Sequence, residues 1–370
     1  MAAVESALKH VKRQVRELSA YTLRHYEPRI KLNQNESPYD VPDELKERLW
    51  SRLAERPWNR YPPFVATDFI SAVAEATGWP DAGVLVGNGS NELIQSLLAT
   101  VVEPGRTVVI PEPTFTLYGL LTRVGGGTVA AVPLNPELRF DVGAIIRRAT
   151  ESAASIIVLC SPNNPTGAAL TKEEVEAIHD GTDSLVVLDQ AYVEFGGYDA
   201  IPLLRDRPRL IILRTFSKAM AMAGLRAGYL LAHPELVREF AKAKLPYNIN
   251  FVTETIAAEV LRNRDLLQPR IDRIRSERDR LHDALSRIPA LRVYRSESNF
   301  ILFRVEHAEL DHRHVFQRLL EDWGVLVRDV SGYPMLDRCL RVNAGGAEEN
   351  DVFLEAMKRL VGSDSQRLSS

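Results

Sequence analysis

Between residues 84 and 231 the chain alternates short, wholly apolar segments with longer stretches of helical periodicity. The apolar segments are rich in Val, Ile and Leu and too short for helices, which is typical of strands buried on both faces of a parallel sheet. They lie at 84–86, 107–110, 128–132, 155–160, 185–188 and 210–213. The sequence therefore predicts an α/β domain with a mostly parallel sheet between helices. In such a sheet, ligands bind beyond the carboxyl ends of the strands.

From about residue 254 the pattern changes to long charged helices and separate strands, which indicates a second, smaller α+β domain. We expect an N-terminal arm over 1–30, a large domain over 31–253 and a small domain over 254–370. Apolar residues near the N-terminus recur at helical spacing and predict one amphipathic helix through Val4, Leu8, Val11, Val15 and Leu18. Such a helix either contacts a second subunit or covers its own domain.

The charge and cysteine content narrow the class of protein. A formal net charge of -3, with acidic and basic residues mixed throughout, excludes a basic field for nucleic acid and a polybasic patch for membranes. No apolar run reaches membrane-spanning length. The two cysteines, Cys160 and Cys339, each lie beside apolar residues, which favours buried thiols in a reducing compartment and predicts a cytoplasmic location. His312 and His314 lie two apart on a predicted helix and point in different directions, so no metal site is expected.

Lys218 follows the last of these apolar segments and lies among small apolar residues. An ammonium group in such surroundings loses hydration, so its pKa falls and its amine becomes a usable nucleophile. Ser217 and Arg226, nearby in the sequence, have donors that suit a phosphate. Taken alone, however, a Ser-Lys pair is more often an ordinary surface lysine.

Two further polar segments follow predicted strands. Residues 87–91, Gly-Asn-Gly-Ser-Asn, lead from a strand into a helix, and their glycines allow helix N-terminal NH groups to face an anion. A tight turn with a capping residue has the same pattern. In the rigid turn 161–167, Asn164 is either a donor aimed at a ligand or part of an Asx turn. The Asn164-Pro165 bond is a candidate cis peptide.

Asp189 ends an apolar strand, where a carboxylate is unfavourable unless it meets a cationic or protonated partner. Tyr192 lies three residues later, and its phenol can reach the same ligand. A capping aspartate and a packed tyrosine are the alternatives.

Together these side chains form a set that one cofactor uses, pyridoxal 5'-phosphate. Asp189 keeps its ring nitrogen protonated, Asn164 and Tyr192 bond the ring oxygen, and Lys218 forms the Schiff base. The predicted phosphate ligands are Ser217, Arg226, Thr215 and the backbone of Gly89, Ser90 and Asn91. Lys218, Asp189 and Tyr192 are the predicted catalytic residues.

The order of the motifs along nearly the whole chain resembles that of the fold type I pyridoxal-phosphate aminotransferases, specifically the histidinol-phosphate aminotransferase family. The motifs are Leu32 to Pro38, Arg60 to Pro62, Gly87 to Glu92, Pro113 to Phe115, Cys160 to Gly167, Asp189 to Tyr192, Arg214 to Tyr229, Leu245 to Asn248, Ser298 to Phe300 and Leu340 to Val342. Two positions depart from the common pattern: Gln190 replaces a frequent Glu, and Ala219 to Met222 replace a run that usually contains an aromatic residue.

The resemblance implies a seven-stranded type of sheet in the large domain, further site residues and an obligate homodimer with shared active sites. Phe115 would stack on the cofactor ring, and Tyr61 would reach the cofactor phosphate of the neighbouring subunit. The substrate would lie against Tyr21, Asn35, Asn164, Arg328 and Arg341. Guanidinium groups bind carboxylate or phosphate in a bidentate manner, which suits the two arginines, although each can also form a salt bridge within the protein.

The reaction implied by the resemblance is amino transfer from L-histidinol phosphate to 2-oxoglutarate in histidine biosynthesis. A transaminase for aromatic or other amino acids is the nearest alternative, because a two-arginine pocket accepts carboxylate as well as phosphate. A pyridoxal-phosphate decarboxylase or lyase on the same fold is a second alternative, and a non-catalytic binding protein a third.

Overall fold

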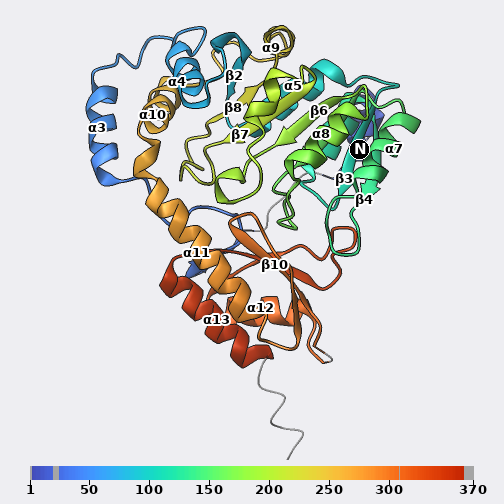
Figure 1. Ribbon diagram of the computed structural model, residues 1–370, viewed down its shortest axis with the longest axis vertical. Coiled ribbons are helices and arrows are strands. Elements are labelled where there is room, and N and C mark those ends of the chain that lie inside the picture. The colour runs from blue at the N-terminus through green and yellow to red at the C-terminus, as the bar shows by residue number, and fades with distance from the viewer. Residues whose placement is uncertain (1, 20–24, 308, 362–370) are drawn as a thin grey trace, which may run out of the picture.

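The computed structural model of the protein describes residues 2–19, 25–307 and 309–361. Within these ranges the chain forms a large body around a seven-stranded sheet and a smaller body around a four-stranded sheet. The two bodies lie one above the other in Figure 1, and α11 (Gln268–Leu285) runs from the large body into the small one. None of the helices in the described ranges is long and apolar enough to span a membrane.

The large sheet confirms the predicted α/β fold. Its strands lie in the order β2-β8-β7-β6-β5-β3-β4, and all pairs are parallel except those made by β8. Their bounds are β2 (Val84–Gly87), β3 (Thr107–Glu112), β4 (Thr128–Pro133), β5 (Ile156–Cys160), β6 (Leu185–Asp189), β7 (Leu210–Thr215) and β8 (Gly228–Leu231). The sequence pattern did not single out β8, because this short antiparallel strand follows β7 through a polar loop instead of a helix.

Alternate residues of each strand enter two separate apolar clusters, one on each face of the sheet. Val158 and Ile211 belong to one cluster, whereas Ile157 and Ile212 belong to the other. The first face is covered by α5 (Ser90–Val101), α6 (Leu117–Gly125) and α9 (Pro234–Ala241). The second is covered by α3 (Asp43–Ala54), α4 (Thr67–Thr77), α7 (Val142–Glu151), α8 (Lys172–Asp180) and α10 (Phe251–Arg262). Each fully buried Leu or Ile contributes roughly 1.5–3 kcal/mol, so the two faces anchor the strand ends firmly.

The small body is an antiparallel sheet in the order β12-β13-β10-β9 with three helices. Its elements are β9 (Leu291–Val293), β10 (Phe300–Val305), β12 (Arg328–Asp329), β13 (Cys339–Asn343), α11, α12 (His312–Trp323) and α13 (Ala347–Val361). The chain's early segment joins this body, because β1 (Ile30–Lys31) pairs in parallel with β11 (Val325–Leu326). Helix α10, which spans the predicted boundary at residue 253, packs against α3 and α4 of the large body. The domain limits themselves stay a prediction.

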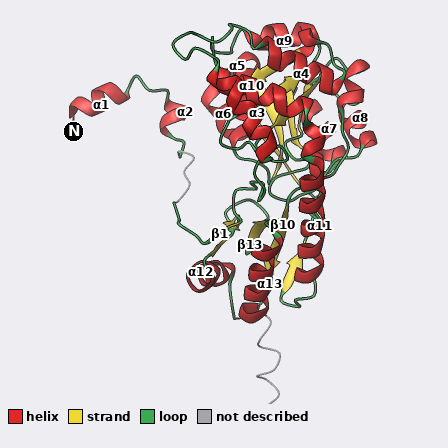
Figure 2. Ribbon diagram, turned by 90° about the vertical axis from the view of Figure 1, so that its left-hand side faces the viewer, coloured by secondary structure: helices red, strands yellow, loops and turns green. Residues whose placement is uncertain are grey.

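The predicted single N-terminal helix is wrong. The segment forms two short helices, α1 (Ala2–Leu8) and α2 (Arg13–Arg16). In Figure 2, α1 lies away from the two bodies, whereas α2 contacts α6 of the large body. Val4, Leu8 and Val11 are exposed. An isolated helix of this length is marginal without a surface to cover its apolar side, which explains the break.

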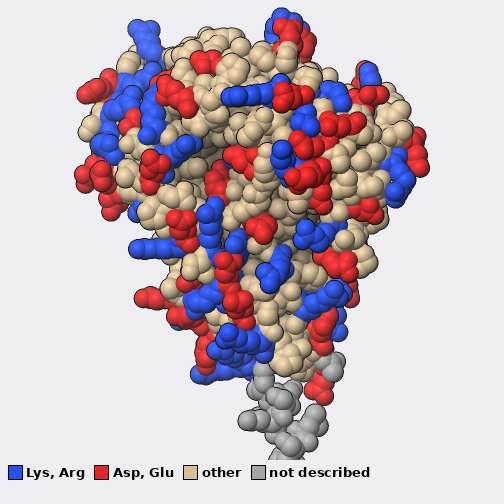
Figure 3. Space-filling view, viewed as in Figure 1, with Lys and Arg blue, Asp and Glu red and all other residues tan. Residues whose placement is uncertain are grey.

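Acidic and basic residues, which are mixed along the sequence, are also mixed on the visible surface. On the face shown in Figure 3, basic and acidic side chains are interspersed over both bodies, without a large area of one sign.

Candidate active site

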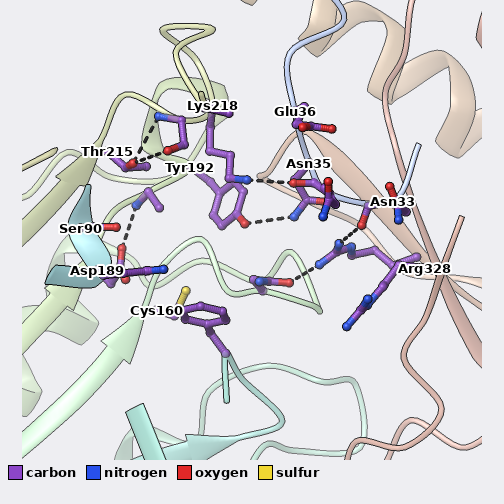
Figure 4. A pocket seen from close by; sticks show the side chains of 18 of the residues that line it. Asn33, Asn35, Glu36, Ser90, Cys160, Asp189, Tyr192, Thr215, Lys218 and Arg328 are labelled. Carbon is purple, nitrogen blue, oxygen red and sulfur yellow. Dashed lines mark hydrogen bonds between the residues drawn. The ribbon is translucent and has the colours of Figure 1, made fainter. Parts of the chain in front are cut away.

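A cavity of about 290 Å³ opens at the carboxyl ends of the parallel strands, with walls from both bodies. Cys160, Asp189 and Thr215 lie at the ends of β5, β6 and β7, while Arg328 and Arg341 come from β12 and β13 of the small body. Figure 4 shows Asp189 and Thr215 on one side, Arg328 on the other, and Lys218 and Tyr192 between them. The strand order thus brings together motifs that are far apart in the sequence.

Lys218 follows β7 and projects into the cavity. Its Nζ donates a hydrogen bond to the carbonyl oxygen of Gln34 at 2.9 Å. Burial, followed by the nearby positive charge of Arg341, lowers the pKa of Lys218 from its ordinary 10.5 to about 7. The amine is therefore neutral in a substantial fraction of molecules at neutral pH, as a nucleophile requires.

Beside Lys218, the hydroxyls of Thr215 and Ser217 and the guanidinium of Arg226 lie within hydrogen-bond distance of one another. Arg226 Nη1 donates to Ser217 Oγ at 3.1 Å and to the carbonyl oxygen of Ala223 at 3.0 Å, and Thr215 Oγ1 donates to Ser217 Oγ at 3.1 Å. Helix α5 begins next to them, and Ser90 and Asn91 of its first turn line the cavity. Hydroxyls, a guanidinium and a helix N-terminus together offer donors of the kind that suit a phosphate group.

The approach of Arg226 to the start of α5 requires a glycine. Gly89 has φ +80°, and a Cβ built on it would lie 2.6 Å from Arg226 Nη2. A side chain at this position would be strained and would also displace the guanidinium.

Asp189 is 3% exposed at the end of β6. Tyr118 donates its hydroxyl to Asp189 Oδ2 at 2.7 Å, and the backbone NH of Ala191 donates to Oδ1 at 3.1 Å. Burial raises the pKa of Asp189, these two hydrogen bonds oppose the rise, and no cationic group in the described part of the chain acts on it. A buried carboxylate that lacks a cation and faces a cavity fits a ligand with a protonated nitrogen.

Asn164 and Tyr192 are oriented by neighbours on the substrate side. Arg341 Nη1 donates to Asn164 Oδ1, so the amide NH₂ of Asn164 remains available as a donor. Tyr192 accepts a hydrogen bond from Asn35 Nδ2 at 3.0 Å, which leaves its own hydroxyl proton to donate. Burial raises the pKa of Tyr192, so the phenol is protonated at neutral pH. The Asn164-Pro165 bond is cis, which confirms that hypothesis.

Asn35 lines the cavity, yet it is 1% exposed and tied to the small body. Its backbone NH donates to Asn343 Oδ1 at 3.2 Å, and its carbonyl oxygen accepts from Asn299 Nδ2 at 3.1 Å. Because its side-chain amide also bonds Tyr192, Asn35 links the small body to the phenol. The predicted contact with substrate stays a prediction.

The structure places one other predicted site residue away from the cavity wall. Tyr61 is 82% exposed, does not line the cavity and stacks on Tyr247 with 4.8 Å between ring centroids. Tyr21 lies outside the described residues. Phe115 does line the cavity, with its ring edge-to-face with Tyr118 at 5.6 Å.

Sequence reasoning missed several residues of the cavity wall. They are Asn33, Gln34, Glu36, Tyr118, Val330 and Tyr333, together with Cys160, which was predicted only to be a buried thiol. A signal existed for Tyr118, which lies three residues after Phe115 and hence on the same side of a helical turn. Glu36 directly follows Asn35 and forms an ion pair with Lys31 at 2.7 Å. No sequence pattern indicated this pair, so Glu36 was not predicted as a cavity residue.

Comparison with known proteins identifies the family. A model described as aminotransferase class I and II matches residues 27–357. The chain belongs to this family. The histidinol-phosphate aminotransferase of Chlorobaculum parvum is 43% identical over 330 residues, 89% of this chain and 92% of that protein. The histidinol-phosphate aminotransferase of Chlorobium phaeovibrioides is 38% identical over 96% of this chain and 98% of that protein. These findings confirm the resemblance inferred from the motifs.

Solved structures agree on the fold. Histidinol-phosphate aminotransferase from Sinorhizobium meliloti, in complex with pyridoxal-5'-phosphate, has a TM-score of 0.86 at 24% identity and covers 97% of this chain and 99% of its own. L-threonine-O-3-phosphate decarboxylase from Porphyromonas gingivalis has a TM-score of 0.79 at 24% identity, over 90% of this chain and 99% of its own. Class I and II aminotransferases in general depend on pyridoxal 5'-phosphate, so the family agrees with the cofactor predicted from the sequence.

Proposed function

We propose that the protein transfers the amino group of L-histidinol phosphate to 2-oxoglutarate, giving imidazole acetol phosphate and L-glutamate in histidine biosynthesis. One observation carries the proposal: a lysine of lowered pKa shares a cavity with a buried, cation-free carboxylate and a phosphate site. The names of relatives that are 38–43% identical support the choice of substrate.

Pyridoxal 5'-phosphate, when bound, supplies an aldehyde and an electron-withdrawing ring. The described residues fit it group by group. Thr215, Ser217, Arg226 and the first turn of α5 would hold its phosphate. Asp189 would bond its protonated ring nitrogen and so gain the cation that the buried carboxylate lacks. Asn164 and Tyr192 would donate to the ring oxygen, and Phe115 would cover one ring face.

Lys218 has two tasks that both depend on its pKa of about 7. Its neutral amine would hold the bound cofactor through its aldehyde. Once free, the same amine takes the proton from the substrate carbon that bears the amino group and later returns a proton. Because the pKa lies close to neutral pH, the amine can accept and release that proton with a small free-energy difference.

Arg341 and Arg328 would bind the anionic end of each substrate. Arg341 donates Nη2 to the carbonyl oxygen of Asn33 at 2.7 Å, donates Nη1 to Asn164 of the large body and lies 5.1 Å over the ring of Phe300, so its position is set by both bodies. Guanidinium groups match phosphate and carboxylate alike, which suits an enzyme that takes a phosphate ester in one half-reaction and a dicarboxylate in the other.

A homodimer with shared sites would account for Tyr61. Its exposed ring stacks on Tyr247, and Phe64 packs edge-to-face against the same tyrosine, so three exposed aromatic rings lie together. Exposed apolar surface of this kind is typical of an interface. Mixing inactive Lys218→Ala subunits with Tyr61→Ala subunits would restore one intact site per hybrid, so about a quarter of wild-type activity should return after random exchange of a two-fold dimer. A mixture that stays inactive would contradict shared sites.

We also propose a cytoplasmic location, because Cys160 and Cys339 are buried and unpaired in the described part of the chain.

The substrate assignment is tested by kcat/KM for L-histidinol phosphate and for phenylalanine on the same preparation. Phenylalanine offers the arginines only a carboxylate in place of the phosphate ester, so we expect a preference of roughly 100-fold for histidinol phosphate. Equal values would favour an aromatic transaminase. Release of carbon dioxide without glutamate would favour a decarboxylase.

A further inference from the structure

Tyr118 is fully buried at the start of α6, and its hydroxyl points at the carboxylate of Asp189. Asp189 Oδ2 is its hydrogen-bond acceptor, at 2.7 Å. The ring packs edge-to-face with Phe115, and a phenylalanine would keep that contact. The hydroxyl therefore adds little to packing, and its effect falls on Asp189.

The proton in this hydrogen bond stays on Tyr118. Burial and the adjacent charge of Asp189 raise the pKa of Tyr118 well above its ordinary value, so the phenol remains a donor at any working pH. The thiol of Cys160 lies beside the pair, and burial raises its pKa to about 12, so it adds no negative charge there. The arrangement is a neutral donor next to one carboxylate.

We infer that Tyr118 lowers the proton affinity of Asp189 and thereby keeps the shared proton on the ring nitrogen of the bound cofactor. The inference rests on the proposed function for its catalytic meaning. When a carboxylate accepts a hydrogen bond, its charge is stabilised and it becomes a weaker base. A weaker base leaves the proton on the nitrogen, and a positively charged ring withdraws electrons more strongly from the substrate carbon.

Asp189 has one other donor, the backbone NH of Ala191, at 3.1 Å to Oδ1. That bond cannot be removed by changing a side chain and is the longer of the two. Tyr118 is thus the side chain in the described structure that tunes Asp189 directly. It acts through Asp189 and is a positioning residue.

The first test uses holoenzyme loaded with cofactor that carries nitrogen-15 at the ring nitrogen. Wild type, Tyr118→Phe and the control Tyr294→Phe are compared; Tyr294 is a buried tyrosine next to β9 in the small body, away from the cavity. In Tyr118→Phe the nitrogen-15 shift should move toward the value of an unprotonated ring. We expect kcat to fall roughly tenfold, since the lost hydrogen bond is made to a charged group and only part of its free energy is felt in the transition state.

The control should match wild type in both measurements. The Kd of the cofactor should change less than about threefold in Tyr118→Phe, because the phosphate ligands are untouched. An unchanged nitrogen-15 shift in a folded Tyr118→Phe protein would overturn the inference.

The second test needs neither turnover nor cofactor. In the full chain labelled with carbon-13 at aspartate carboxyl groups, Asp189→Asn identifies the Asp189 signal, and its pKa is then read from a pH titration. Tyr118→Phe should raise that pKa. Fluorotyrosine at position 118, a more acidic phenol of nearly the same shape, should lower it and also serves if Tyr118→Phe does not fold. A pKa insensitive to both replacements would refute the tuning role even if amino transfer is observed. A protein that shows the two opposite shifts but transfers no amino group would instead refute the proposed function.

Discussion

Replacing Lys218 with methionine should stabilise the cofactor-free protein at neutral and acidic pH. The structure lowers the pKa of this lysine from 10.5 to about 7, first through burial and then through the charge of Arg341. The folded protein therefore disfavours the ammonium that the unfolded chain carries. Methionine fills a similar volume without that charge.

The magnitude follows from the shift. At about 1.4 kcal/mol per pKa unit, a fall from 10.5 to about 7 corresponds to at most roughly 5 kcal/mol. Lys218 is only partly buried, and cavity water screens its charge, so we expect about 2–3 kcal/mol. The unfolded state binds the extra proton between pH 7 and 10.5, hence wild-type stability rises with pH across that window. The advantage of Lys218→Met should be largest below pH 7 and vanish near pH 10.5.

Denaturant unfolding of cofactor-free wild type and Lys218→Met, at several pH values from 6 to 10, measures this difference. Lys358→Met, at an exposed position on α13, controls for loss of a surface charge. A difference between wild type and Lys218→Met that does not vary with pH would refute the reasoning.

Two other changes have directions set by the structure. Gly89→Ala should lower the free energy of unfolding by about 1–3 kcal/mol and raise the Kd of the cofactor at least about tenfold, because it strains the backbone and displaces Arg226. Gly78→Ala is the control, because Gly78 also has a positive φ but nothing lies within 4 Å of a Cβ built there, so only stability should change. Equal cofactor Kd values for the two variants would contradict this account. Gln190→Glu should destabilise the protein by about 1–3 kcal/mol at pH 7 and less at pH 5. The change removes the side-chain donor to the Tyr198 carbonyl oxygen. It also places a further carboxylate beside those of Glu194 and Asp199, which already contact Arg214. Urea unfolding at both pH values checks it, and greater loss at pH 5 would argue against it.

The strands of the large sheet were predictable because each is short, apolar and buried on both faces, a pattern specific to parallel sheets. Motifs that follow such strands necessarily meet at one edge, which is why Lys218, Asp189 and Asn164 were found together from the sequence. The antiparallel strand β8 and the break between α1 and α2 were not predictable in this way. Both depend on which surfaces lie beneath the segment.

The contacts that tune the site were also hidden. Asn35 and Tyr192 are 157 residues apart, and Tyr118 and Asp189 are 71 apart, so no local pattern links them. Each bond forms only because the folded backbone brings two buried polar groups within 3 Å. Burial then makes these bonds necessary, since an unpaired polar group in the core is unfavourable.

The most direct test of the central claim follows the amino nitrogen itself. Holoenzyme is given L-histidinol phosphate labelled with nitrogen-15 at its amino group, together with unlabelled 2-oxoglutarate, and the products are analysed by mass spectrometry. Wild type should form labelled glutamate and imidazole acetol phosphate in equal amounts, and Lys218→Ala should form neither. Glutamate without label, or labelled glutamate from Lys218→Ala at the wild-type rate, would contradict the account.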